Sequence, residues 1–270
     1  MGSQIKTVKT DNFSMDYFKF GQGEETFVIL PGLSVQSVMG FAEQVAEAYK
    51  VLADNYTVYM FDRRSDLPEK YSIHDMAEDT AEAMKELDLE KVHLFGASQG
   101  GMISMDITIN HPELVNKLVL GSTTAAVKDE QFRTIEKWMD LAKAGDGEGL
   151  YLAFGKEVYP EEVYEQSKEL LTEAGKTVTE EEFERFTVLA EGMRGFDLTK
   201  DLGKIDCPVL VLGDKTDKVV GAAASERIAE LLADKDCTLY MYDGYGHAAY
   251  DMAPDYKERI LEFLANSSKN

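Results

Sequence analysis

Short runs of β-branched and aromatic residues alternate with longer helical patterns along the first half of the chain. The runs are Thr26–Leu30, Tyr56–Phe61, Lys91–Phe95 and Lys117–Leu120. Between them, the spacing of apolar residues predicts helices over Ser37–Ala53, His74–Leu87 and Gln99–Asn110. This alternation predicts an α/β fold, in which a mostly parallel central β-sheet is flanked by helices. The N-terminal segment to Phe20 alternates in a way that predicts antiparallel strands at the sheet edge.

The strand signal is absent between residues 127 and 200, where Glu, Lys, Leu and Ala predominate. We expect several helices here, including Asp129–Ala144 and Thr179–Glu191. Strands return at Cys207–Leu212 and Cys237–Tyr242, and helices are expected at Ala222–Ala233 and Asp255–Ala265. We therefore predict a sheet domain made of residues 1–126 and 201–270, with residues 127–200 inserted as a helical cap.

The charge balance of the chain excludes several classes of partner. Its 270 residues include 50 Asp and Glu against 28 Lys and Arg, which gives a net charge of −22. A surface of this sign repels phosphate backbones and anionic membranes. We therefore expect a small-molecule substrate, with no nucleic acid and no membrane as partner; the charge does not predict the oligomeric state.

Two further features concern location and cofactors. No apolar run approaches the ~18 residues of a membrane span, and the opening residues lack a hydrophobic signal-peptide core. We expect a cytoplasmic protein. Cys207 and Cys237 each begin an apolar run, which favours buried, unpaired thiols over a disulfide or metal site. No motif calls for a metal ion or a cofactor.

A Gly-x-Ser-x-Gly motif stands between a predicted strand and a predicted helix. It comprises Gly96, Ala97, Ser98, Gln99 and Gly100. A sharp strand-to-helix turn needs small residues on both sides of the serine, and it presents the hydroxyl at the positive end of the following helix. A glycine-rich turn with an incidental serine would not explain small residues on both sides. The motif predicts Ser98 as a nucleophile.

The sharp strand-to-helix turn that carries Ser98, here called the elbow, resembles that of the α/β-hydrolase superfamily. The strand order and the later motifs extend this resemblance over nearly the whole chain. The resemblance implies a serine, then an acid after a late strand, then a histidine near the C-terminus. Of four histidines, His247 alone fits this order, because His74 and His93 precede Ser98 and His111 ends the next helix. His247 is therefore the predicted general base.

Two aspartates follow the strand at Cys207–Leu212 and compete for the role of the acid. Asp217 precedes an apolar pair in the way that the family pattern implies, and we favour it over Asp214. Asp214 would then cap the loop or bind its backbone. A carboxylate behind the imidazole fixes its tautomer and stabilises the imidazolium, which makes the serine hydroxyl a competent nucleophile.

The family also implies two backbone N–H groups that bind the oxyanion. One belongs to Gln99, after the nucleophile. The other is expected from Leu33, although the Pro31-Gly32 that precedes it could also be a simple turn. We interpret residues 62–65 (Asp-Arg-Arg-Ser) as a structural ion-pair turn rather than a substrate contact. Four aromatic residues of the insertion either line a pocket or, for most of them, pack the helices together: Trp138, Tyr151, Phe154 and Tyr159.

The function predicted from these residues is hydrolysis of a small carboxylic ester, uncharged or apolar, through an acyl-enzyme on Ser98. Amide, thioester or carbon–carbon bond hydrolysis could use the same residues, because fold does not settle substrate. A dehalogenase of this superfamily needs an aspartate at the nucleophile position, so the serine at position 98 excludes this activity. An alternative of a different class is a ligand sensor, in which an intact triad serves tight binding and the cap contacts a partner.

Overall fold

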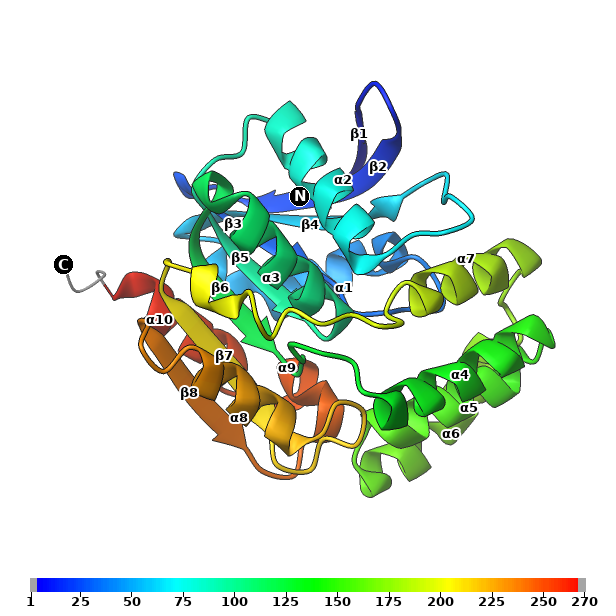
Figure 1. The fold of residues 1–270 in the computed structure, drawn as a ribbon. Coiled ribbons are helices and arrows are strands. Elements are labelled where there is room, and N and C mark those ends of the chain that lie inside the picture. Colours follow the sequence, from blue (N-terminus) through cyan, green and yellow to red (C-terminus); the bar gives the residue numbers. More distant parts are fainter. Residues whose placement is uncertain (1–3, 267–270) are drawn as a thin grey trace.

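The computed structural model describes residues 4–266. Residues 1–3 and 267–270 lie outside the described part, and the signal-peptide prediction concerns in part these first residues. Eight strands form one sheet in the order β1-β2-β4-β3-β5-β6-β7-β8 (Figure 1). Their bounds are β1 Ile5–Lys9, β2 Ser14–Gly21, β3 Glu25–Leu30, β4 Tyr56–Arg64, β5 Val92–Ala97, β6 Val115–Gly121, β7 Val209–Asp214 and β8 Cys237–Tyr242. β1 and β2 are antiparallel at one edge, whereas the pairings from β4 to β8 are parallel. The predicted fold class is confirmed.

Helices cover both faces of the sheet, because alternate strand residues point to opposite sides. Val28, Leu94 and Leu118 belong to a core cluster with α2 (Ile73–Glu86), α3 (Gln99–Asn110) and α8 (Ala222–Leu231). Their neighbours Ile29, Phe95 and Val119 belong to a second cluster on the other face. That cluster includes residues of α1 (Ala42–Ala48) and α10 (Tyr256–Ala265). The remaining short helices of the sheet region are η3 (Pro112–Leu114), η4 (Leu202–Lys204), η5 (Gly246–Ala248) and α9 (Ala249–Met252).

Two predicted elements differ from the structure for reasons that the local sequence explains. The helix expected over residues 37–53 is broken into η1 (Val38–Phe41), α1 and η2 (Lys50–Leu52). Ser37 accepts the Met39 N–H and begins a 3-10 turn, and Gly40, a poor helix former, follows. β7 begins after the predicted Cys207, because Pro208 has no N–H to donate to a neighbouring strand.

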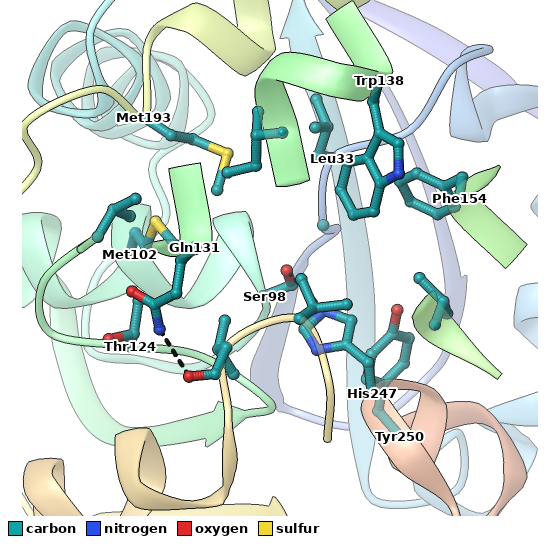
Figure 2. Close-up of a pocket in the computed structure, with 16 residues that line it drawn as sticks. Leu33, Ser98, Met102, Thr124, Gln131, Trp138, Phe154, Met193, His247 and Tyr250 are labelled. Carbon is teal, nitrogen blue, oxygen red and sulfur yellow. Dashed lines mark hydrogen bonds between the residues drawn. The ribbon is translucent and has the colours of Figure 1, made fainter. Parts of the chain in front are cut away.

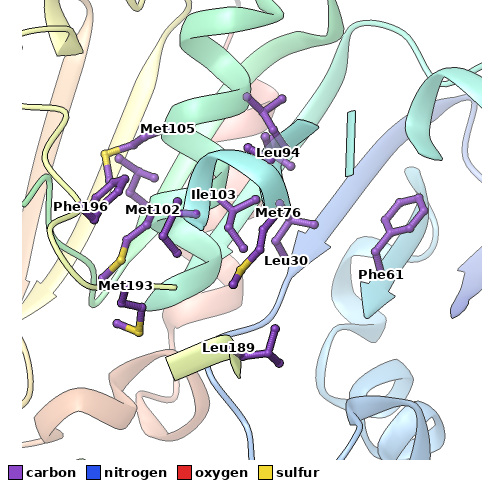
Figure 3. Packing of buried hydrophobic residues seen from close by; sticks show 14 of the residues in the cluster. Leu30, Phe61, Met76, Leu94, Met102, Ile103, Met105, Leu189, Met193 and Phe196 are labelled. Atoms are coloured by element: carbon purple, nitrogen blue, oxygen red, sulfur yellow. The ribbon is translucent and has the colours of Figure 1, made fainter. Parts of the chain in front are cut away.

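Four α-helices lie between β6 and β7 in the sequence, as the loss of the strand signal predicted. They are α4 (Asp129–Lys143), α5 (Gly147–Val158), α6 (Glu161–Gly175) and α7 (Glu180–Glu191). Leu189, at the end of α7, and the following Met193 and Phe196 share one hydrophobic cluster with Met102 and Met105 of α3 (Figure 3). These helices are thus packed onto the sheet region. The division into a core and a cap domain stays a prediction.

None of the helices within residues 4–266 has both the length and the apolar character needed to cross a bilayer.

Candidate active site

The predicted site residues follow four parallel strands of the sheet. Leu33 lies after β3, Ser98 after β5, Asp217 after β7 and His247 after β8. Carboxyl ends of parallel strands meet at one edge of a sheet, where ligands bind in open α/β folds. Topology alone therefore gathers residues that are far apart in the sequence.

Ser98 has a strained backbone, with φ 52° and ψ −119°, at the junction of β5 and α3. Its N–H donates to the Gly121 carbonyl at 2.8 Å, and its carbonyl accepts from Thr123 Oγ1 at 2.7 Å. A Cβ at Gly100 would lie 2.0 Å from the Leu30 carbonyl oxygen. Because Gly100 has no side chain, α3 can begin directly against the end of β3. The hydrogen bonds of the Ser98 backbone keep the strained conformation of this strand-to-helix turn in place.

The structure brings Ser98, His247 and Asp217 into one chain of hydrogen bonds. His247 Nε2 lies 2.9 Å from Ser98 Oγ, and His247 Nδ1 lies 2.9 Å from Asp217 Oδ2. All three residues are less than 10% exposed. With the carboxylate facing Nδ1–H, Nε2 is free to accept the serine proton. His247 lies within the 3-10 helix η5, between β8 and α9.

The environment keeps Asp217 ionised. Burial raises the pKa of its carboxyl. The adjacent His247 and the N–H groups of Val220 and Val219 lower this pKa by more than burial raises it, so it lies below its ordinary value. The two N–H groups donate to Oδ1 at 3.1 and 2.8 Å. Oδ2 is therefore left for the imidazole.

Asp214, the alternative acid, has another set of partners. Its Oδ1 accepts the Thr216 N–H at 2.7 Å, and its Oδ2 accepts the Tyr245 N–H at 2.9 Å. It therefore ties the loop that carries Asp217 to the loop that carries His247. The aspartate in contact with the histidine is Asp217.

The predicted oxyanion donors are Gln99, which follows Ser98 directly, and Leu33, which lies in the loop after β3. Gln99 is the first residue of α3, so its N–H has no partner inside the helix. Leu33 lines the same cavity as Ser98, and a Cβ at the preceding Gly32 would lie 3.2 Å from the Ser98 Cβ. The loop after β3 therefore passes in van der Waals contact with the nucleophile. The oxyanion roles of Leu33 and Gln99 stay predictions.

The first three residues of the predicted Asp-Arg-Arg-Ser turn are instead the last part of β4, which extends to Arg64, and they position these loops from outside the cavity. Arg63 Nη2 donates to the Pro31 carbonyl at 2.8 Å and to Gln99 Oε1 at 3.2 Å. Burial lowers the pKa of Arg63 to about 10, so the guanidinium remains charged at neutral pH. Asp62 forms an ion pair with Arg185 of α7. The predicted ion pair agrees with these contacts, whereas the predicted turn was wrong because the strand continues through these residues. The link from Arg63 to the Gln99 side chain had no signal in the sequence.

A narrow, mainly apolar cavity of about 30 Å³ opens at Ser98 and His247 (Figure 2). Trp138 and Phe154 line it, with ring centroids 4.7 Å apart. Tyr151 and Tyr159 do not line it, and Tyr151 Oη instead donates to Gln36 Oε1 at 3.0 Å. The other lining residues are Gly32, Leu33, Met102, Thr124, Val127, Gln131, Ile135, Val158, Met193, Val219, Val220 and Tyr250.

Three polar lining residues were not predicted: Thr124, Gln131 and Tyr250. Gln131 Nε2 donates to the Val220 carbonyl at 2.6 Å, and Gln131 Oε1 accepts the Lys128 N–H at 2.7 Å. It therefore joins the start of α4 to the loop that carries the acid. No motif marks these positions, because they belong to three separate segments that meet only in the fold.

One cluster in residues 4–266 has the donor types for a metal ion. His74, Glu78 and Asp106 place one ligand atom each within 4.8 Å of one another, on α2 and α3. His74 and Glu78 are exposed, and His74 Nδ1 lies 2.9 Å from Asp106 Oδ1, which already explains the cluster as a contact between two helices.

Both cysteines are free and partly buried. Burial raises the pKa of the Cys207 thiol to about 12 and that of Cys237 to about 11. The predicted absence of a disulfide is confirmed, although burial is less complete than expected.

Comparison with known proteins agrees with this geometry. The model of the alpha/beta hydrolase fold family matches residues 25–254. The chain belongs to the α/β-hydrolase family. A relative from Agrobacterium fabrum, named "Putative carbamate hydrolase RutD", is 28% identical over 80% of this chain and 85% of its own.

Three solved structures share the fold. MGS-M2, an α/β-hydrolase enzyme from a Medee basin deep-sea metagenome library, has a TM-score of 0.87, 20% identity and coverage of 98% of this chain and 99% of its own. The enol-lactonase from Burkholderia xenovorans LB400 has a TM-score of 0.82, 18% identity and coverage of 97% and 100%. The esterase EaEST from Exiguobacterium antarcticum has a TM-score of 0.77, 20% identity and coverage of 98% and 100%.

Proposed function

We propose that this member of the α/β-hydrolase family is a serine hydrolase that cleaves small, uncharged carboxylic esters. The observation that carries the proposal is the buried chain of hydrogen bonds from Asp217 through His247 to Ser98, which ends in an apolar cavity. A serine hydroxyl is a weak nucleophile unless a positioned base takes its proton. These contacts supply the base and the group that orients it.

In the proposed reaction, Ser98 Oγ attacks the ester carbonyl carbon while His247 Nε2 takes its proton. Asp217 stabilises the resulting imidazolium. The carbonyl oxygen becomes an oxyanion that accepts hydrogen bonds from the backbone N–H groups of Leu33 and Gln99. His247 then gives the proton to the departing alcohol. His247 then takes a proton from water as the water attacks the acyl-enzyme carbonyl, and it returns this proton to Ser98 Oγ as the bond to the acyl group breaks and the carboxylic acid leaves.

The cavity lining supports an uncharged substrate with a short acyl group. His247 is the one ionisable side chain besides the tyrosine Tyr250 among the lining residues, and none is Lys, Arg, Asp or Glu. A charged group in such surroundings loses hydration without gaining a partner. A cavity of about 30 Å³ suits a short chain better than a long one.

Hydrolysis of a carbamate ester is a second candidate, supported by the name of the relative from Agrobacterium fabrum. A neutral carbamate ester presents the same carbonyl to Ser98 and fits the uncharged lining. A carbamate anion would find no lysine or arginine among the residues that line the cavity. The neutral compound is therefore the form to test.

The test is labelling with a fluorophosphonate probe beside turnover of nitrophenyl esters of increasing acyl length and a nitrophenyl carbamate. We expect labelling and fastest turnover of the shortest esters by the wild type, and neither by Ser98→Ala. Ser34→Ala is the matched control, because Ser34 lies on the same sheet edge outside the cavity and should keep both.

Labelling that persists in Ser98→Ala would remove the nucleophile assignment. Preference for long acyl chains would contradict the proposed substrate size. Rapid turnover of the carbamate relative to the acetate would favour the second candidate. Tight ligand binding with negligible turnover would favour the sensor role instead.

A further inference from the structure

One polar group in the cavity has no partner, namely the hydroxyl of Tyr250. The other polar side chains there are satisfied: Gln131 at both ends, Thr124 Oγ1 by the Ala126 carbonyl at 2.7 Å, and Ser98 by His247. Tyr250 Oη forms no hydrogen bond with any group in residues 4–266. Figure 2 shows it pointing into the cavity beside His247.

The tyrosine is held firmly in this position. It lies in α9 directly after the turn that carries His247, and the two rings meet edge to face with centroids 6.2 Å apart. Lys257 Nζ donates to the Tyr250 carbonyl. These contacts place the ring beside His247 at the cavity.

The hydroxyl is a hydrogen-bond donor throughout the working pH range. Burial, followed by the charge of Asp251, raises the pKa of Tyr250 well above its usual value. A phenol that remains protonated offers its proton to an acceptor. Because this donor faces the cavity and has no acceptor in the protein, a substrate oxygen can accept its proton, and a site that hydrogen-bonds a substrate oxygen discriminates against analogues that lack it.

We propose that Tyr250 is a specificity-determining donor that binds a second oxygen of the substrate, an ether or hydroxyl oxygen close to the ester group. This rests on the proposed function, since it places the ester carbonyl at Ser98 and in the oxyanion site. The carbonyl oxygen is then engaged by backbone N–H groups. Tyr250 selects oxygenated esters over plain alkyl esters of equal size.

Pairs of isosteric esters test the proposal, because each pair exchanges one CH₂ for one oxygen. Ethyl methoxyacetate against ethyl butyrate probes the acyl side, and 2-methoxyethyl acetate against butyl acetate probes the alcohol side. The measured quantity is kcat/KM of the oxygenated ester divided by kcat/KM of the alkyl ester. This ratio is compared between wild type and Tyr250→Phe, so that the intrinsic reactivity of the esters cancels. We expect Tyr250→Phe to lower the ratio about tenfold for one pair.

Tyr159→Phe is the matched control. Tyr159 is partly buried but outside the cavity lining, and the ratios of this variant should equal those of the wild type. Equal ratios in wild type and Tyr250→Phe for both pairs would overturn the proposal. A uniform loss of kcat on all four esters would also overturn it, because Tyr250 would then act on the reacting atoms rather than select the substrate.

A binding measurement separates this proposal from the proposed function. Trp138, the single tryptophan of the chain, lines the cavity, so its fluorescence reports occupancy without turnover. The ligands are two isosteric ketone pairs, methoxyacetone with 2-pentanone and 4-methoxy-2-butanone with 2-hexanone. We expect the wild type to bind one ether at least tenfold tighter than its partner and Tyr250→Phe to lose this preference.

If the wild type does not hydrolyse esters but still binds the ether ketone more tightly than its partner, the proposed function alone is contradicted. Ester hydrolysis with no discrimination in either assay would overturn the role of Tyr250 alone. The emission spectrum of Trp138 in Tyr250→Phe shows whether the variant has folded.

Discussion

At the scale of single residues, Ser98 combines a strained backbone with the position predicted for the nucleophile. Its φ of 52° is uncommon for a residue with a side chain, and the hydrogen bonds at its N–H and carbonyl keep it there. Strain of this kind costs about 1–3 kcal/mol and persists when the surrounding structure determines the conformation. The elbow thus loses stability in order to present the hydroxyl.

Replacing Ser98 by glycine should relieve the strain. We expect the free energy of unfolding of Ser98→Gly to rise by about 1 kcal/mol, because glycine adopts positive φ without steric cost. Ser98→Ala retains the Cβ and should not gain stability. Urea denaturation of both variants measures the difference, and equal stability would show that the elbow is not strained.

Asp217 provides a prediction of pH dependence. Its pKa is lowered in the folded state, so its stabilising contribution is complete above the ordinary value of 3.8 and is lost as pH falls below it. We expect Asp217→Asn to be less stable than the wild type by a constant amount from about pH 8 to about pH 5. The difference should shrink below about pH 4. Urea titrations at several pH values measure it; a difference that shrinks already near neutral pH would contradict the prediction.

The same variant should reduce kcat by roughly 10⁴ for the proposed ester hydrolysis, because an amide no longer holds the histidine tautomer. Asp214→Asn is the comparison. Asp214 contacts loop backbone rather than His247, so its loss should act mainly on stability.

At the scale of elements, local signals set most boundaries. Helix α3 has the predicted bounds, and α2 is preceded by Ser72, which forms a capping box with Asp75. Helices α5 and α6 were expected only as part of a helical block. Asp146 accepts the Gly149 N–H at the start of α5, and Pro160 precedes α6, but these signals are weaker than a capping box.

Packing of α3 against the end of β3 depends on the absence of a side chain at Gly100. We expect Gly100→Ala to lose at least ~2 kcal/mol of stability or to fail to fold, since a backbone oxygen lies 2.0 Å from the new Cβ. Gly40→Ala is the matched control, because a Cβ there meets nothing within 4 Å. Thermal unfolding compares the two; similar melting temperatures would contradict this role of the elbow.

At the scale of the whole molecule, a strongly acidic protein surrounds an uncharged cavity. The net charge of −22 produces a long-range electric field that acts on molecules approaching the protein. The uncharged lining of the cavity determines which of them fit once they have entered. Such a field raises the encounter rate of cations and is screened by salt. Encounter and fit can therefore be measured separately.

Butyrylcholine and its neutral isostere 3,3-dimethylbutyl butyrate separate the two effects. We expect kcat/KM for the choline ester to fall severalfold between about 10 mM and about 500 mM salt, while that of the neutral ester changes little. Steady-state kinetics across this range is the measurement. Parallel salt dependence of both esters would show that the field does not act at the entrance.

The sequence by itself determined the α/β class, the order of the elements and the positions of Ser98, His247 and the competing aspartates. The class, the order of elements and Ser98 follow from periodicity and turn chemistry, which are local along the chain. His247 and the aspartates follow from the order that the resemblance to the α/β-hydrolase superfamily implies. Arrangements that depend on several distant segments could not be predicted in this way.

Only the tertiary structure decided that Asp217 rather than Asp214 faces His247, that Trp138 and Phe154 rather than Tyr151 and Tyr159 line the cavity, and that Tyr250 Oη is left without a partner. Each depends on the direction in which a side chain points after helices and loops from separate segments have packed. Apolar periodicity places a residue on a face but does not specify what it meets there. The catalytic roles of the assembled residues stay predictions until the variants are measured.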